Sequence, residues 1–204
     1  MNRDCADAIF LQFICEHDKM VTEIMNRSIG GLIMEKQLIR ISVRNLVEFI
    51  LRSGDIDNRI ASSDKDAMQL GAKLHRKIQR QMGADYRAEV TLKRVISYEG
   101  FDIQVEGRAD GIIDTEGEVC IDEIKGIFKE LDTMKEPIEI HLAQAKCYAC
   151  IYAEKQKLER VGVQMTYCNM ETEEIRRFKE EYEAEELEEW FLNLVGRYEK
   201  WARF

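Results

Sequence analysis

Proline is nearly absent from this chain: it occurs once in 204 residues, beside 12 glycines. This composition excludes a collagen-like chain, a proline-rich ligand and a linker-like protein. No apolar run approaches the roughly 18 residues that a membrane-spanning helix needs. Acidic residues interrupt the N-terminal apolar stretches, so we expect neither a membrane segment nor a signal peptide. Six cysteines are too few for a disulfide scaffold of this length, which favours a reducing, cytoplasmic environment.

The sequence does contain enough apolar and charged residues for a folded domain, 45% and 34% respectively. A net charge of −9 argues at first against a nucleic-acid partner, but the charge is uneven. Residues 171–189 hold ten glutamates and three basic residues, a charge of −7, whereas residues 71–94 hold seven basic and two acidic residues, a charge of +5. Local patches decide where a polyanion binds, so the basic stretch keeps such a partner open.

The apolar periodicity changes along the chain from helical to extended and back. Helices are predicted over residues 1–37, 42–53, 63–82 and 137–157, and from 171 nearly to the end. Strands are predicted over residues 87–97, 101–113, 118–126 and 160–169. This order indicates an N-terminal helical extension, 1–37, followed by a domain, 38–204, that ends in a long amphipathic helix. The domain is predicted to be α/β, with a mixed sheet of four to five strands flanked by helices.

The predicted strand over residues 118–126 carries two charges where burial is expected. Both of its faces are apolar, which is typical of a central strand, yet Glu123 and Lys125 share one face. Burying such a pair costs several kcal/mol per ion unless partners compensate. The pair is therefore either a structural ion pair or a functional one.

Asp110 favours the functional interpretation. It lies near the end of the preceding strand, and a turn at residues 114–117 would bring it close to Glu123. Two adjacent carboxylates repel each other unless one is protonated or a divalent cation lies between them. Cations of the Mg²⁺ type bind one or two carboxylates together with water and phosphate, and a neighbouring lysine can donate to the attacking oxygen or to the phosphate. The three residues together indicate phosphodiester hydrolysis.

Four motifs follow one another along the chain, in the order His75, Gly107-x-x-Asp110, Glu123-Ile124-Lys125 and Gln144-x-x-x-Tyr148. Together they resemble the motifs of the PD-(D/E)XK nuclease superfamily, and within it those of the RecB/Cas4-like branch. The resemblance covers roughly residues 40–170 and implies a restriction-endonuclease-like core. Residues 41–46 are also similar to the start of nuclease modules fused to bacterial superfamily 2 DNA helicases.

The resemblance implies a role for each matching position. Asp110, Glu123 and the carbonyl of Ile124 would bind Mg²⁺ or Mn²⁺, and His75 would complete the site or hold a second ion. Lys125 would orient and activate the attacking water. Gln144 and Tyr148 would contact the scissile strand or support Lys125.

Basic residues outside the motifs are candidates for phosphate contacts. Lys73 and Arg76 lie beside His75 in the basic stretch, which continues into the predicted strand over residues 87–97. Arg108 shares a strand face with Asp110, and it either contacts phosphate or pairs with Glu106.

Several nearby polar residues have plainer interpretations. Asp122 is predicted to face away from Lys125 and to have a structural hydrogen-bonding role, and His141 is predicted to be a surface residue in the first turn of its helix. Glu89 is a weaker candidate for an outer metal or water contact. Some relatives hold a [4Fe–4S] cluster with a close-spaced cysteine trio after the Gln-x-x-x-Tyr helix. Only Cys168 follows that helix here, so no iron–sulfur cluster is expected.

The sequence thus predicts a metal-dependent DNA nuclease, with exonuclease favoured because no additional region is available for base reading. Two alternatives stay open. One is a catalytically inactive DNA-binding or docking module for a helicase or repair complex. The other is an RNA nuclease of the same fold.

Overall fold

The computed structural model describes residues 36–51 and 64–203. Most of the predicted helical extension over residues 1–37 lies outside these ranges. The residues from Leu38 onward form one unit. Within the described ranges, no helix is both long and apolar enough to cross a membrane.

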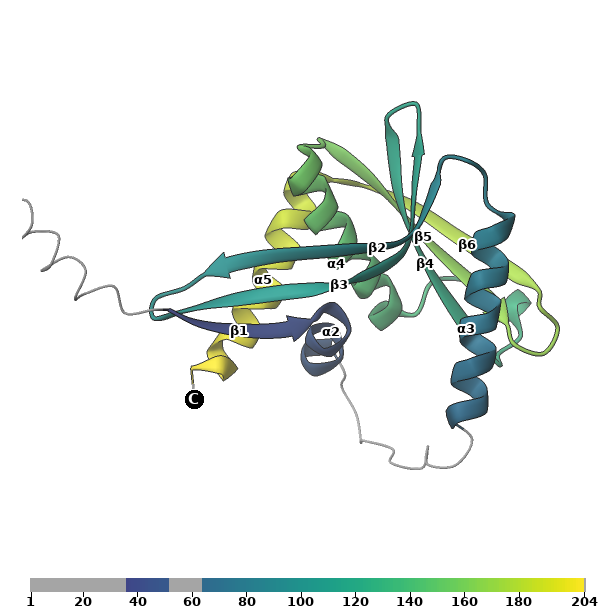
Figure 1. Ribbon diagram of the computed structural model, residues 1–204, viewed down its shortest axis with the longest axis horizontal. Helices are drawn as coiled ribbons and strands as arrows, with labels where there is room; N and C mark the ends of the chain where they lie inside the picture. The colour runs from purple at the N-terminus through teal and green to yellow at the C-terminus, as the bar shows by residue number, and fades with distance from the viewer. Residues whose placement is uncertain (1–35, 52–63, 204) are drawn as a thin grey trace, which may run out of the picture. The chain divides into compact units, whose positions relative to one another are not determined.

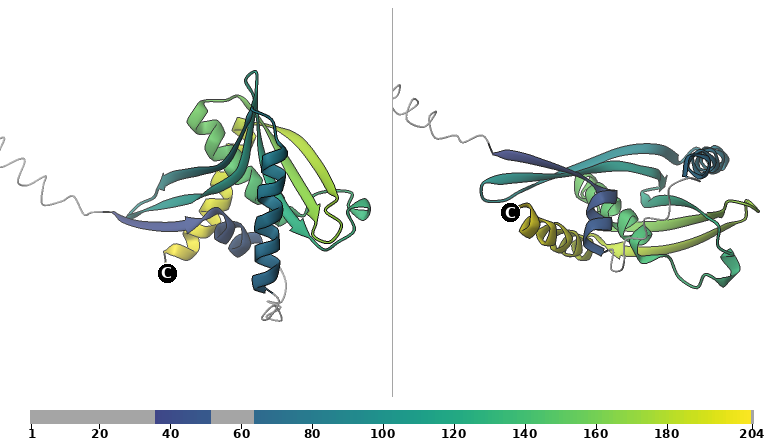
Figure 2. Two further views of the ribbon diagram at one scale, coloured as in Figure 1. Left: turned by 45° about the vertical axis from the view of Figure 1, so that its right-hand side comes forward. Right: turned by 90° about the horizontal axis from the view of Figure 1, so that it is seen from below.

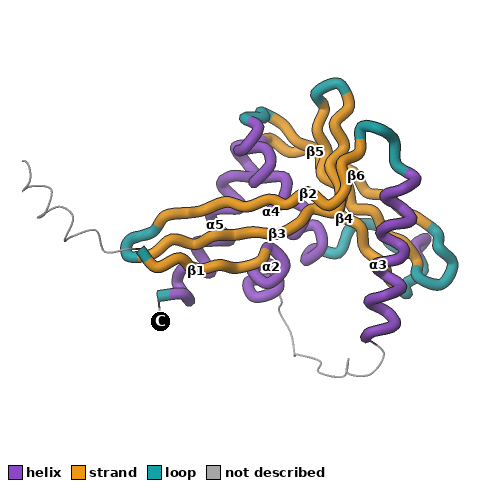
Figure 3. The backbone as a smooth tube through the Cα atoms, viewed as in Figure 1, coloured by secondary structure: helices purple, strands orange, loops and turns teal. Residues whose placement is uncertain are grey.

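The sheet contains six described strands: β1 (Gln37–Ser42), β2 (Tyr86–Ser97), β3 (Phe101–Thr115), β4 (Glu118–Ile127), β5 (Arg160–Asn169) and β6 (Ile175–Glu183). Their order is β1-β3-β4-β5-β6, and β2 pairs with β3 as the second arm of a long antiparallel hairpin (Figures 1 and 3). The β3–β4 and β5–β6 pairs are antiparallel, whereas β4 and β5 are parallel. This parallel pair requires a crossover, which helix α4 (Glu139–Gln156) provides.

Helices cover both faces of the sheet; besides α4, the described residues form α2 (Val43–Leu51), α3 (Asp64–Gln81) and α5 (Ala184–Ala202). α4 packs against β4 and β5, and α2 and α5 cover it in turn. α3 packs on the opposite face, against Ile124 of β4, and lies apart from the other helices in Figure 2. The Ser42 side chain accepts a hydrogen bond from the Asn45 N–H at 3.1 Å and caps α2.

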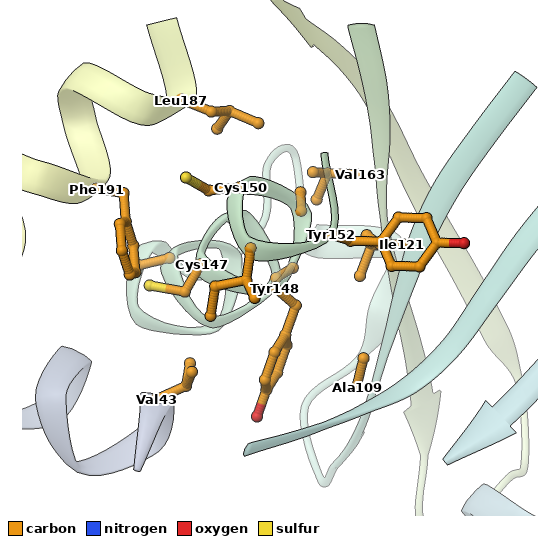
Figure 4. Packing of buried hydrophobic residues seen from close by; sticks show 14 of the residues in the cluster. Val43, Ala109, Ile121, Cys147, Tyr148, Cys150, Tyr152, Val163, Leu187 and Phe191 are labelled. Atoms are coloured by element: carbon orange, nitrogen blue, oxygen red, sulfur yellow. The ribbon is translucent and has the colours of Figure 1, made fainter. Parts of the chain in front are cut away.

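Helix α4 lies in the middle of the main core and is buried on nearly all sides. Its small residues allow neighbouring elements to approach it from several directions. On one side Cys147 lies near Phe191 of α5 and Cys150 near Leu187 of the same helix, and on the other side Ile121 and Val163 come from the sheet (Figure 4). Packing against α4 therefore helps to set the positions of the parallel strands β4 and β5.

The structure corrects two secondary-structure predictions. Residues 171–183, predicted as the first half of the long C-terminal helix, contain β6, and only α5 is helical. Phe178 and Tyr182 explain the error, because a spacing of four residues fits both a helical stripe and one face of a strand. Residues 37–42 form β1, which was not predicted. The α/β class and the helix-flanked mixed sheet are confirmed, with six strands instead of four to five.

Candidate active site

Strand β3 separates from β4 at Asp110. The hydrogen-bonded ladder between the strands ends at Gly111, and continuing its register would place Asp110 opposite Glu123. Instead, Asp110 Oδ2 accepts a hydrogen bond from the backbone N–H of Ile124 at 2.8 Å. The carboxylate thus replaces a lost ladder bond, and it lies close enough to Glu123 to raise the pKa of that residue.

The Glu123 carboxylate is buried with only one of its two oxygens satisfied. Lys125 Nζ donates to Oε1 at 2.8 Å, while Oε2 has no hydrogen-bond partner among the described residues. Glu123 is 5% exposed, and this burial raises its pKa to about 7, opposed by Lys125 and assisted by Asp110. An unsatisfied buried polar group costs about 1–3 kcal/mol. The arrangement therefore differs from a completed structural ion pair.

Helix α3 contributes two side chains to this point. His75 Nδ1 lies 3.5 Å from Asp110 Oδ1. One turn later, Gln79 Nε2 donates to the Asp110 carbonyl at 2.9 Å and to Glu89 Oε1 at 3.0 Å. Glu89 has a φ of 59°, a left-handed conformation that is unfavourable for glutamate. Gln79 was not identified from the sequence, although its position four residues after His75 places it on the same helix face.

Arg108 pairs with Glu89, not with Glu106. The Arg108 Nε lies 2.5 Å from Glu89 Oε2, and the arginine side chain is 67% exposed. Glu106 instead accepts a hydrogen bond from Gln104. Glu89 is therefore tied to both Gln79 and Arg108, and the exposed guanidinium lies on the strand that carries Asp110.

The two residues of the Gln-x-x-x-Tyr motif are both buried on α4. Tyr148 is 7% exposed and Gln144 is 4% exposed. The Tyr148 hydroxyl forms a hydrogen bond with the backbone of Arg108 and lies over Gly107, where an added Cβ would be 2.6 Å from Oη. Figure 4 shows the ring extending from α4 with its hydroxyl directed away from the helix. Tyr148 thus braces β3 just before Asp110.

Lys125 has a further neighbour that the sequence did not reveal. Tyr167 of β5 is its Cα partner in the parallel ladder and is fully buried. The Tyr167 oxygen accepts the Ile138 N–H at 2.9 Å and lies 3.3 Å from His141 Nδ1. Burial lowers the pKa of His141 to about 4, with Lys125 and Arg44 contributing in the same direction. His141 lies in the first turn of α4, as predicted, but it is only partly exposed, and its ring contacts Tyr167.

Asp122 lies on the opposite face of β4, as predicted. Its Oδ1 accepts hydrogen bonds from Thr166 at 2.5 Å and from Gln164 at 3.0 Å, and its Oδ2 accepts one from Tyr86 at 3.2 Å. Burial raises the pKa of Asp122 and the three donors oppose that shift. All three donors are side chains of β2 and β5, so these hydrogen bonds join strands of the sheet and have a structural role.

The basic side chains of α3 lie on another flank of the helix. Lys73 and Arg76 line a groove of about 570 Å³ together with Lys77 and Arg80. At 3.6 residues per turn, Lys73, Lys77 and Arg80 lie roughly opposite His75 on the helix. Their side chains therefore lie on the far side of the helix from the Asp110–Glu123 site, and Lys77 pairs with Glu173.

A mixed sheet covered by helices, with two acidic residues and a lysine where two strands separate, defines a restriction-endonuclease-like core. The family model described as the PD-(D/E)XK nuclease superfamily matches residues 32–204, and the chain belongs to this superfamily. The comparisons do not test the RecB/Cas4-like branch or the helicase fusion, which stay predictions.

Solved structures with a similar fold share little sequence with this chain. The crystal structure of SSO0001 is 17% identical, covers 86% of this chain and 85% of its own, and has a TM-score of 0.50. The alkaline exonuclease LHK-Exo from Laribacter hongkongensis is 15% identical, covers 80% of this chain and 92% of its own, and has a TM-score of 0.41. No curated protein matches the chain.

Nucleases of this superfamily generally use divalent metal ions. In the part of the chain that the structure describes, no three His, Cys, Asp or Glu side chains are already grouped as a metal site. The donor set nevertheless fits a hard cation, because the buried Glu123 Oε2 lacks a partner and the Asp110 carboxylate is its neighbour. Carboxylate and carbonyl oxygens are the ligands that Mg²⁺ and Mn²⁺ prefer.

Proposed function

We propose that this protein is a metal-dependent nuclease that hydrolyses phosphodiester bonds of DNA at Asp110, Glu123 and Lys125. The observation that carries the proposal is the half-satisfied Glu123 carboxylate, with Lys125 on one oxygen and no partner for the other. Buried ionisable groups without a full set of partners are typical of sites that bind a ligand or carry out a reaction. Membership of a nuclease superfamily supports the same reaction class.

In this proposal Asp110, Glu123 and the Ile124 carbonyl hold Mg²⁺ or Mn²⁺, and His75 completes the site or holds a second ion. When bound, such a cation supplies positive charge to the phosphate and acidifies the attacking water. His75 already lies beside Asp110. Lys125 orients the attacking water, because its Nζ lies at the Glu123 carboxylate and has donors to spare.

The low exposure of Gln144 and Tyr148 favours a supporting role for both over direct contact with the substrate. Tyr148 holds the Arg108 backbone and so sets the position of Asp110 two residues later. Gln144 lies one turn before Tyr148 on the same helix face. Support of this kind keeps catalytic side chains within a fraction of an ångström of their working positions.

The substrate proposal rests on positive charge. Lys73 and Arg76 in the α3 groove, and the exposed Arg108 beside Asp110, are proposed to contact backbone phosphates. These contacts carry no sequence information, which suits an exonuclease acting on DNA ends. A helicase or repair complex is the proposed partner, on the strength of the motif resemblance.

The test is release of nucleotides from linear double-stranded DNA, single-stranded DNA and RNA, with Mg²⁺, Mn²⁺ or EDTA. We expect metal-dependent release from DNA, and at least about a 10²-fold loss in K125M, as expected for removal of a fixed donor at the reacting groups. E123Q should lose activity because it weakens binding of the metal ion. E118Q is the matched control, because Glu118 is an exposed residue at the far end of the same strand.

Undiminished release from E123Q would place the active centre elsewhere. Preferential cleavage of RNA would reassign the substrate. Salt-sensitive DNA binding with no cleavage, unchanged in E123Q, would identify a non-catalytic module instead.

A further inference from the structure

Tyr167 and His141 form a pair beside Lys125. Tyr167 and Lys125 are adjacent on parallel strands, so their side chains lie on the same sheet face, beneath the start of α4. The buried Tyr167 hydroxyl reaches two groups there, the Ile138 N–H and His141 Nδ1. The histidine and tyrosine rings are 5.9 Å apart at their centroids. The imidazole is thus held against the strand neighbour of Lys125.

These contacts favour one form of the imidazole. The Tyr167 oxygen already accepts the Ile138 N–H. Its own O–H can donate to His141 Nδ1, 3.3 Å away, when that nitrogen carries no proton. A neutral imidazole that accepts at Nδ1 carries its proton on Nε2. The lowered pKa of His141 keeps the ring neutral near pH 7.

In this tautomer the remaining nitrogen, Nε2, is a hydrogen-bond donor. Nε2 lies on the side of the ring away from Nδ1, and among the described residues it has no hydrogen-bond partner. The charged groups around the ring are Lys125, Arg44 and Glu48. Two of these three are cations, so the surroundings of the ring suit an anionic group.

We propose that His141 is a further catalytic residue, whose Nε2–H donates a hydrogen bond to the phosphate being cleaved, and that Tyr167 is the positioning residue that fixes the tautomer. The inference deepens the proposed nuclease function and rests on it. The imidazole donates a hydrogen bond and transfers no proton. Fixed donors of this kind stabilise the charge that develops in a transition state, and loss of one lowers kcat by about 10²–10³-fold.

Two substitutions at position 141 separate this role from simple packing. H141F keeps an aromatic ring against Tyr167 but has no donor, while H141Q loses the ring but places an amide N–H near the Nε2 position. We expect kcat to fall about 10²-fold in H141F, with KM little changed, and to recover partly in H141Q. Y167F should give an intermediate loss, because the imidazole can then take either tautomer. A packing role predicts the reverse order, with H141F active and H141Q impaired.

A second measurement does not depend on catalysis. Nitrogen NMR of the protein labelled at histidine, in EDTA, reports which imidazole nitrogen carries the proton. We expect Nε2–H, and a shift of the His141 Nε2 signal when a short single-stranded DNA oligonucleotide is added. A proton on Nδ1, or a His141 signal that does not respond to bound DNA, would overturn the inference.

The wild type and E123Q are assayed alongside. Equal activity of H141F and wild type, with E123Q inactive, would refute the role of His141 and leave the nuclease proposal standing. An inactive wild type would refute the nuclease proposal, and the NMR measurement would still decide the tautomer and the phosphate contact.

Discussion

The contact between Gly107 and Tyr148 allows a prediction in which sterics, stability and activity are linked. The φ of Gly107 is not in the left-handed region, so alanine is acceptable to the backbone, and the only obstacle is space. An added Cβ would lie 2.6 Å from Tyr148 Oη, 3.0 Å from Cε1 and 3.2 Å from Cζ. The ring is buried between α4 and β3 and has little room to retreat. G107A should therefore destabilise the protein by about 1–3 kcal/mol, as overpacking does.

The same clash should lower activity, because Asp110 lies three residues farther along β3. Y148F removes the closest atom, and by itself it costs about 0.5–1.5 kcal/mol through the lost hydrogen bond with the Arg108 backbone. We expect G107A/Y148F to be less destabilised than the sum of the single variants by about 1 kcal/mol, a coupling typical of residues in contact.

Urea denaturation of the four proteins measures this coupling, and G196A is the matched control. Gly196 lies in α5, where an added Cβ meets nothing within 4 Å. G196A should stabilise the protein by about 0.5–1 kcal/mol, because alanine is the better helix residue. A stable G107A, or full additivity with Y148F, would refute the assignment of Tyr148 as the brace of β3.

Three further predictions follow from the site and its surroundings. D122N should cost about 1–3 kcal/mol in urea denaturation, because it disturbs the three hydrogen bonds of a buried carboxylate. Its kcat should still match wild type, and a large loss of kcat would mean that Asp122 takes part in catalysis. Since the pKa of His141 is lowered from 6.5 to about 4, the unfolded chain binds the proton first, and stability should be lost as pH falls from 6.5 toward 4. H141F should show a weaker pH dependence over that range, and parallel curves would refute this origin. Mn²⁺ at about 100 times its Kd should stabilise wild type by about 2.7 kcal/mol and E123Q much less; equal stabilisation would place the metal elsewhere.

The local order of residues was enough to predict the strands that carry the site. Alternation over residues 101–113 identified β3, and apolar residues on both faces over residues 118–126 identified β4 as a central strand. A period of two places Glu123 and Lys125 on one face of β4. The prediction failed for β6, because the four-residue spacing of Phe178 and Tyr182 fits both a helical stripe and one face of a strand. The α/β class followed from the order of the elements, since a helix between two strands favours a parallel pair.

The sequence by itself determined which chemical groups this protein has and which of them share a strand or a helix face. Only the tertiary structure decided that β3 leaves β4 at Asp110, that Glu123 Oε2 is left without a partner, and that Gln79 bonds the Asp110 carbonyl. The pairing of Lys125 with Tyr167, and of Tyr167 with His141, depends on the register of two parallel strands joined through α4. No short-range pattern encodes that register, because it is set by how α4 packs on the sheet.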